Sequence, residues 1–234
     1  MNSGIDAHAH LGDIEEEGAI ERARKELCAV VTCGYSLATS MRALEVARQN
    51  EGFVFACVGV SPQIAGRGEA WRAVLRLVDE GGVVAVGEVG LDGKYGGMAR
   101  QRECFEAFIE KALQNGLPLV IHSRKAEHEV LQMLVEKGAR RVLLHCFSGK
   151  LEQAVEAARR GFLFSIPPVP SKERRKIARE IPLEKLLLES DAPYLGREPT
   201  DILKSAQIIA AEKKMPLETV VAATAENARK FYGL

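Results

Sequence analysis

The chain has 234 residues, of which 47% are hydrophobic and 27% are charged. This composition supplies one sizeable core and excludes a chain that is disordered in bulk. Lysine plus arginine and aspartate plus glutamate number 32 each, so no net charge attracts long nucleic acids through counterion release. A polyanionic substrate would have to be bound by local charges.

The first residues, MNSGIDAHAHLGDIEEEG, lack a cationic segment followed by a long apolar one, and charges interrupt every apolar run. The sequence therefore predicts neither a signal peptide nor a membrane span, and we expect a cytoplasmic protein that does not bind membranes. Five scattered cysteines, some within apolar segments, are typical of free thiols in a reducing compartment. No segment indicates an obligate protein partner.

Eight short strand-like segments recur along the chain, with helical patterns between them. They span residues 5–11, 28–34, 53–60, 83–90, 117–123, 141–147, 162–166 and 185–191. Several are continuously apolar, which is typical of parallel strands covered on both faces. Because no linker or low-complexity tract divides the β–α units, we predict an α/β fold with one domain over residues 1–234, a (β/α)₈ TIM barrel. A doubly wound open sheet is the alternative fold.

The first of these segments, IDAHAHL, carries Asp6, His8 and His10 at every second position. Side chains of a strand alternate between its faces, so these three are expected on one face and the apolar residues on the other. A half-solvated strand also alternates, but it carries Lys, Thr or Glu more readily than two imidazoles. The pattern therefore raises the possibility of a metal-binding histidine pair.

The carboxyl ends of the strands form the mouth of a TIM barrel, where its reactive side chains gather. The expected strand ends carry four imidazoles and two carboxylates, namely His8, His10, Glu88, His122, His145 and Asp191. This donor set without thiolates suits two divalent cations better than a closed structural zinc site. Glu88, at the centre of the mouth, can bridge two cations about 3.5–4 Å apart.

Each of these residues also has a purely structural interpretation. A single histidine after an apolar strand is often a hydrogen-bonded core residue, and Asp191 can cap the N-terminus of a helix. Glu189, two residues earlier, can be a buried partner for another side chain. His128 lies in a polar helical segment, where we expect it on the surface. The joint occurrence of six donors at strand ends favours the metal centre.

Five segments, DAHAHL, GEVGLD, LVIHSR, LHCFSG and LLLESDAPYL, occur in this order and together cover nearly the whole chain. They resemble the TatD-like metal-dependent hydrolases of the amidohydrolase superfamily. The resemblance implies a TIM barrel with a two-metal centre and, as in many members, deoxyribonuclease activity. It also implies a ligand assignment, in which one cation is held by His8, His10 and Asp191, the other by His122 and His145, and both by Glu88.

The chain departs from the family pattern in three loops. Where the family usually has His-Pro-His after the third strand, this chain has GVSPQ, with Ser61 and Gln63 in place of the imidazoles. The loop after DAPYL is a compressed GREPTD, whose only cation is Arg197, and the loop SIPPVPSKERRK has prolines in place of a glycine. The substrate cleft is therefore expected to differ from that of other members. We expect the charged residues 171–180 to form a solvated helix face rather than a DNA-binding patch, and the alternative is that they rim the mouth.

The favoured function is hydrolysis of DNA phosphodiesters, from the 3′ end, by a hydroxide that bridges two cations, either Zn²⁺ or Mg²⁺/Mn²⁺. Asp191, together with Glu88, is expected to be catalytic, with Asp191 taking the proton of the attacking water. The expected partners are DNA ends or short nucleic acids. The residues expected to bind the substrate, or to orient the histidines, are Arg124, Lys94, Asp92 and Ser123.

Two other functions remain open. One is an ester or amide hydrolase on the same metal centre, such as the D-aminoacyl-tRNA deacylases found among the resembling proteins. The other is a metal-binding protein without catalysis, which the missing His-Pro-His run favours and the complete ligand set opposes.

Overall fold

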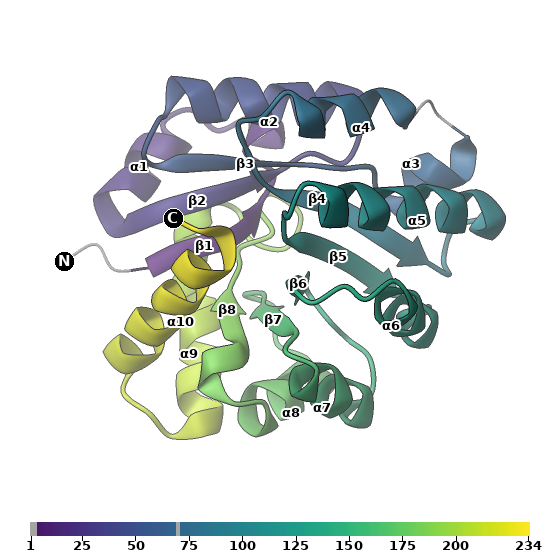
Figure 1. Ribbon diagram of the computed structural model, residues 1–234. Coiled ribbons are helices and arrows are strands. Elements are labelled where there is room, and N and C mark those ends of the chain that lie inside the picture. Colours follow the sequence, from purple (N-terminus) through teal and green to yellow (C-terminus); the bar gives the residue numbers. More distant parts are fainter. Residues whose placement is uncertain (1–3, 69–70) are drawn as a thin grey trace.

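The computed structural model describes residues 4–68 and 71–234. Eight parallel strands form one sheet in which each strand pairs with its neighbours in sequence (Figure 1). The strands are β1 (Gly4–Ala9), β2 (Leu27–Cys33), β3 (Val54–Val58), β4 (Val83–Asp92), β5 (Leu119–Arg124), β6 (Val142–Leu144), β7 (Leu163–Ile166) and β8 (Leu186–Leu188). The predicted single domain over 1–234 includes residues 1–3 and 69–70, which lie outside the described ranges.

The helices surround the sheet on its outer side (Figure 1). They are α1 (Ala19–Glu26), α2 (Leu37–Gln49), α3 (Pro62–Arg67), α4 (Arg72–Asp79), α5 (Met98–Gln114), α6 (Glu127–Glu136), α7 (Leu151–Arg159), α8 (Lys172–Glu180), α9 (Ile202–Lys213) and α10 (Leu217–Tyr232). Three short 3-10 turns accompany them, η1 (Leu11–Asp13), η2 (Leu183–Lys185) and η3 (Pro199–Asp201). None of the described helices is long and apolar enough to cross a membrane.

The last strand returns to the first through the segment that follows β8. The backbone N–H of Asp191 donates to the carbonyl of His8 at 2.9 Å, and the N–H of His10 donates to the carbonyl of Ala192 at 2.7 Å. These bonds confirm the predicted TIM barrel, with strands in the order of the sequence. The alternative open sheet is wrong, because a doubly wound sheet reverses its strand order at a switch point.

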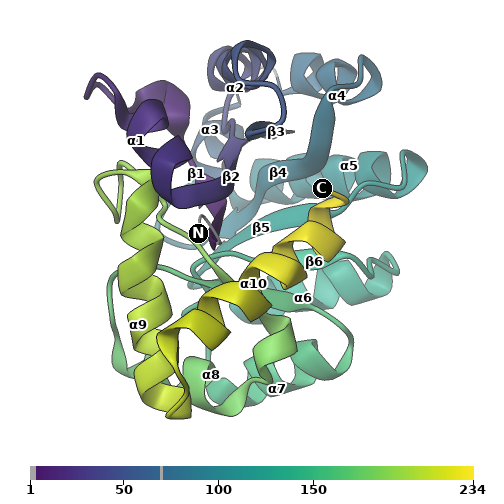
Figure 2. The ribbon, with the colours of Figure 1, turned by 90° about the vertical axis from the view of Figure 1, so that its left-hand side faces the viewer.

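Apolar side chains pack in two layers, one inside the barrel and one between the strands and the helices. The inner layer takes alternate residues from the strands, such as Val31, Val120 and Leu187, and it also includes Phe231 of α10. Figure 2 shows α10 running across one end of the barrel. There the hydroxyl of Tyr232 donates to the carbonyl of Ala7 at 2.7 Å. The end that holds the start of β1 is thus filled, and the reactive side chains occupy the other end.

Strand β1 departs from strict alternation. Its register with β2 shifts between Asp6 and Ala9. Ile5 and Ala7 belong to the inner apolar layer, whereas Ala9 belongs to the outer one. The Asp6 carboxylate accepts hydrogen bonds from the backbone N–H and the hydroxyl of Ser190. The prediction that Ile5, Ala7 and Ala9 share one face, with Asp6 and the two histidines on the other, is therefore wrong, because the strand exchanges its faces between Ala7 and Ala9.

Five predicted strands, those that correspond to β1, β2, β3, β6 and β8, are too long at their carboxyl ends, and the excess is largest, at three residues, for β6 and β8. His145 lies one residue beyond β6, and Asp191 lies three residues beyond β8. Cys146 and Asp191 have φ values of +49° and +47°, a left-handed conformation that cannot continue a strand. The strands therefore end at the positions where the chain turns reactive side chains over the mouth.

Candidate metal centre

Six side chains predicted as metal ligands converge at the carboxyl ends of the strands, namely His8, His10, Glu88, His122, His145 and Asp191. His8 lies in β1, Glu88 in β4 and His122 in β5, and the other three lie just beyond strand ends. A cavity of about 430 Å³ opens over them. The barrel thus brings together residues that are far apart in the sequence, with His8 and Asp191 separated by 183 positions.

The first donor group consists of His8, His10, Asp191 and one oxygen of Glu88. Nε2 of His8 lies 3.2 Å from Nε2 of His10. It lies 3.7 Å from Oε2 of Glu88 and 3.6 Å from Oδ1 of Asp191. Nε2 of His10 lies 3.5 Å and 3.4 Å from the same two oxygens. Tetrahedral ligands about 2.0–2.2 Å from zinc lie roughly 3.3–3.6 Å apart, so these four atoms are spaced as ligands of one cation.

The second donor group uses the other oxygen of Glu88. Nδ1 of His122 lies 2.9 Å from Oε1 of Glu88, and Nε2 of His145 lies 3.4 Å from it. The two ring nitrogens are themselves 3.4 Å apart. Because Glu88 turns one oxygen to each group, its carboxylate lies where a bridging ligand between two cations would lie.

The protonation of these groups follows from their burial and their mutual contacts. Burial opposes a charge on Glu88, but the imidazoles of His145 and His122 lower its pKa well below the ordinary value. Burial lowers the pKa of His8 well below its ordinary value. Burial acts likewise on His145, but Glu88 and Glu189 raise its pKa well above that value. Binding of a cation by His145 would therefore displace a proton.

In three of the four histidines, the ring nitrogen that faces away from the donor group lies beside another residue, whereas Nδ1 of His8 has no hydrogen-bond partner within the described residues. Nδ1 of His10 lies 2.8 Å from the carbonyl of Cys33, and Nε2 of His122 lies 3.0 Å from Oδ2 of Asp92. Nδ1 of His145 lies 3.5 Å from Oε2 of Glu189, the buried partner expected from the sequence. Such contacts fix the tautomer of a histidine and leave the opposite nitrogen free to bind a metal. The residues present therefore fit divalent cations.

Replacing Asp92 with Asn is expected to lower the affinity for a cation held by His122 and His145 about 10- to 100-fold, because His122 loses its anionic partner. Asp92 is buried, and burial opposes its charge, but hydrogen bonds with His122 and Arg124 lower its pKa. The measurement is a calorimetric titration of metal-free protein with Mn²⁺ and with Zn²⁺. Asp79→Asn, which changes an exposed ion pair with Lys111, is the matched control. An unchanged affinity in Asp92→Asn would show that Asp92 does not support a ligand.

Of the residues expected to bind the substrate, Arg124 and Ser123 line the mouth. The guanidinium of Arg124 is held by Asp92, with N···O distances of 2.6 Å and 2.8 Å, and lies 5.5 Å from the ring centre of Tyr95. The buried hydroxyl of Ser123 has no hydrogen-bond partner within the described chain. Lys94 is exposed outside the lining of this cavity, and its backbone N–H donates to Asp92. The structure therefore brings Arg124, but not Lys94, to the site.

Sequence reasoning misses two tyrosines in the mouth. Tyr35 follows β2 and Tyr194 follows Asp191, and their rings lie edge-on to His10, with centroids 5.4 Å and 5.1 Å away. The hydroxyl of Tyr194 lies 3.1 Å from that of Tyr35 and donates to Asp13 at 2.8 Å. The DAPYL segment contains Tyr194, so its position three residues after a predicted ligand was the available signal.

Arg174, in the first turn of α8, also lines the mouth, although the sequence did not single it out among the charged residues 171–180. The expectation of a solvated helix face holds for Arg175 and Arg179, which pair with Glu212 on the outside. It fails for Arg174, which lines the mouth because it lies on the other side of the same helix. Ser61 and Gln63, in place of the family's imidazoles, also line the mouth.

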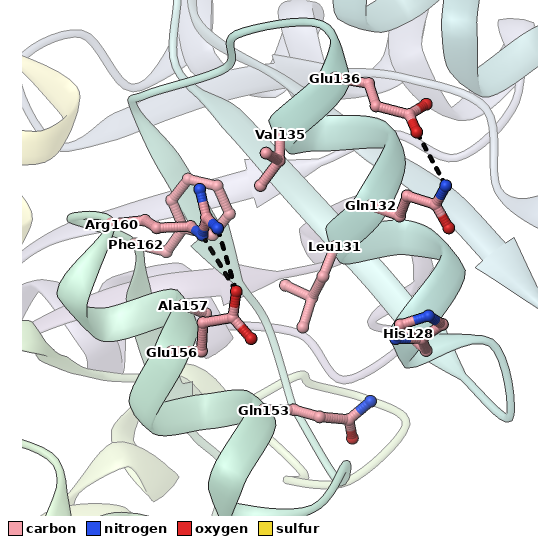
Figure 3. Close-up of a pocket in the computed structure, with 10 residues that line it drawn as sticks. All are labelled: His128, Leu131, Gln132, Val135, Glu136, Gln153, Glu156, Ala157, Arg160 and Phe162. Atoms are coloured by element: carbon pink, nitrogen blue, oxygen red, sulfur yellow. Dashed lines mark hydrogen bonds and ion pairs between the residues drawn. The ribbon is translucent and has the colours of Figure 1, made fainter.

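A second cavity, of about 320 Å³, lies outside the barrel between α6 and α7 (Figure 3). Its walls combine apolar side chains, such as Leu131 and Phe162, with an ion pair between Arg160 and Glu156. His128 lies at its edge and is exposed, as the sequence predicts. Five of the six candidate ligands line the first cavity, and His8 is buried beside them, so the chemistry belongs to the mouth of the barrel.

Comparison with known proteins places this site in a family. A family model described as TatD related DNase matches residues 5–233. The chain belongs to the TatD-related DNase family. This membership confirms the resemblance that the five motifs indicate, and it supports the predicted enzyme class, a metal-dependent hydrolase.

Relatives with curated names match the TatD-related chain over nearly its full length. Deoxyribonuclease TATDN3 from Homo sapiens is 32% identical over 257 residues, which cover 97% of this chain and 94% of the relative. A metal-dependent hydrolase from Bacillus subtilis, YabD, is 33% identical over 253 residues, which cover 97% of this chain and 98% of the relative.

Solved structures of other TatD proteins share the fold. YJJV from Escherichia coli, a TatD homologue, has a TM-score of 0.89 at 22% identity, and the match covers 99% of this chain and 98% of the other. A TatD family hydrolase from Entamoeba histolytica has a TM-score of 0.88 at 22% identity, with the same coverage. At this identity the likeness establishes the barrel, whereas the chemistry has to be argued from the site.

Proposed function

We propose that the protein is a deoxyribonuclease that uses two divalent cations to hydrolyse phosphodiester bonds at DNA ends, working from the 3′ end. The observation that carries the proposal is the position of Glu88, whose two oxygens face separate groups of imidazoles. Paired cations held in this way stabilise the attacking and leaving oxygens of a phosphodiester. The name of the human relative, a deoxyribonuclease, supports DNA as the substrate.

In this proposal His8, His10 and Asp191 would hold the first cation, His122 and His145 would hold the second, and Glu88 would contribute one oxygen to each. Bound cations would lower the pKa of a water molecule and stabilise negative charge on the phosphate oxygens. Nitrogen and carboxylate donors bind Zn²⁺ more tightly than Mg²⁺ or Mn²⁺, which can nevertheless be the working ions where the cell supplies them in excess.

Asp191 is the proposed proton acceptor. Asp191 lines the mouth and its side chain is 11% exposed, so its carboxylate can contact both the histidines and a water molecule. A carboxylate placed there can take the proton of the attacking water and return it to the leaving 3′-oxygen. The positive φ of Asp191 is rare for a residue with a side chain, and such conformations concentrate at functional sites.

The tyrosine pair offers a surface for a nucleobase. Tyr194 is 56% exposed, while its hydroxyl is fixed by Asp13 and Tyr35. Stacking of bases on aromatic side chains tolerates any sequence, as an enzyme that trims DNA ends requires. The two rings lie beside His10, so a base stacked on them would place its phosphate near the candidate cations.

The test uses single-stranded DNA labelled at the 3′ or at the 5′ end. Metal-stripped protein is refilled in turn with Mg²⁺, Mn²⁺ and Zn²⁺, and the products are separated by length. We expect a metal-dependent release of nucleotides from the 3′ end. Protein that binds the cations, leaves DNA intact and hydrolyses D-aminoacyl-tRNA esters or small amides would assign the second type of hydrolase instead.

A further inference from the structure

Arg174 places a cation in the mouth beside the second donor group. Its guanidinium donates to Sγ of Cys146 at 2.9 Å and to the carbonyl of Val169 at 3.2 Å. Cys146 directly follows His145, a candidate ligand. Nε of Arg174 is buried and has no hydrogen-bond partner within residues 4–68 and 71–234. The loop after β7 and the first turn of α8 thus aim a partly unpaired guanidinium at the reactive end of the barrel.

Arg174 differs from two neighbouring arginines, because each of those has a carboxylate partner and the guanidinium of Arg174 does not, within the described residues. Arg124, in the same mouth, is bound by Asp92, and Arg175, the next residue in α8, pairs with Glu212 at 3.1 Å. The two contacts of Arg174 are a thiol and a carbonyl. Across the part of the chain that the structure describes, no carboxylate oxygen is found within 4.0 Å of its guanidinium.

A guanidinium carries five N–H donors in a planar fork that matches the oxygens of a phosphate. Two contacts to the protein leave donors of Arg174 available for a ligand. Ser148, whose side chain lines the same cavity, can add a hydroxyl. An unbalanced cation in a concave site is therefore suited to an anion of the substrate.

We propose that Arg174 forms a second anion subsite, which binds the phosphate adjacent to the one being cleaved. The proposal rests on the proposed function, because it takes the scissile phosphate to lie at the metal centre. It implies a preference for strands with at least two neighbouring phosphates, and it explains how a chain without net charge holds a polyanion. Cleavage of a substrate that lacks this neighbouring phosphate charge should not depend on Arg174.

The test compares two trinucleotides of the same length. One carries two phosphodiesters, and in the other the linkage next to the scissile one is an uncharged methylphosphonate. Arg174→Gln is expected to lower kcat/KM about 10- to 100-fold on the first substrate, the usual effect of losing a charged hydrogen bond. On the methylphosphonate substrate it should change kcat/KM less than about twofold. Arg174→Lys keeps the charge and should recover part of the loss.

Arg175→Gln is the matched control, since it removes an exposed ion pair from the same helix and should leave both substrates unaffected. An equal loss on both substrates, or no loss on either, would overturn the subsite. If the wild-type protein cleaves neither trinucleotide, the proposed function fails, and the subsite is decided by fluorescence anisotropy with a 5′-labelled trinucleotide. Weaker binding by Arg174→Gln than by Arg175→Gln then supports the subsite, and equal binding rejects it.

Discussion

Glu88→Gln is expected to reduce DNA hydrolysis by at least about a hundredfold and to leave fewer than two cations bound per chain. The amide turns an NH₂ group toward one of the imidazole groups, and an NH₂ group is a hydrogen-bond donor that cannot bind a metal. Because each oxygen of Glu88 faces its own pair of imidazoles, one of the two groups loses its shared ligand. Loss of an electrostatic contact to the developing charge costs about 10²–10³ in kcat.

The effect of Glu88→Gln is measured by metal analysis of the dialysed protein together with the labelled-DNA assay. Glu103→Gln, at an exposed residue paired with Arg72, controls for the chemistry of the substitution. Thermal unfolding shows whether the barrel is intact. Near wild-type hydrolysis by a folded Glu88→Gln protein would show that catalysis does not need the Glu88 carboxylate as a shared metal ligand.

Asp191→Asn is expected to lower kcat about 10²- to 10⁴-fold, the usual contribution of general acid–base catalysis. Asn keeps the size of Asp and is among the residues that adopt positive φ most readily, so the loop after β8 should keep its shape. The amide oxygen can still contact a cation, but the side chain no longer accepts a proton at neutral pH.

To interpret the result for Asp191→Asn, the effect on the rate of hydrolysis has to be measured separately from the effect on metal binding. Single-turnover kinetics at saturating metal report the chemical step, and metal analysis reports occupancy. A large loss of kcat with both cations retained is the expected outcome. If the loss vanishes once the metal is saturating, Asp191 acts as a ligand alone and another group moves the proton.

The fold could be predicted from the sequence because several strands are continuously apolar and eight of them recur with helical segments between them. Such a pattern leaves few arrangements other than a barrel, in which the end of every strand lies at one mouth. The convergence of residues as distant as His8 and Asp191 follows from that geometry alone. The candidate ligands could therefore be predicted although the exact strand ends could not. The sequence places the ends of β6 and β8 three residues too late.

The parts that escaped prediction depend on local backbone geometry and on the faces of helices. In the sequence Asp6 fits the alternation of β1. A register shift that no residue type indicates follows it, and Asp6 contacts Ser190 instead of lining the mouth. Arg174 and Arg175 are neighbours with the same side chain, and the orientation of α8 decides which of them faces the mouth. Lys94 is near Glu88 in sequence, yet it lies outside the cavity lining, because a loop side chain is not fixed by strand alternation.

The most direct test of the account is a crystal of the protein grown with Mn²⁺ or Zn²⁺, in which anomalous scattering locates the cations. Two peaks per chain on either side of Glu88, one beside His10 and Asp191 and the other beside His122 and His145, are the predicted result. A single peak, or cations bound away from Glu88, would contradict a centre in which this carboxylate joins two metal sites.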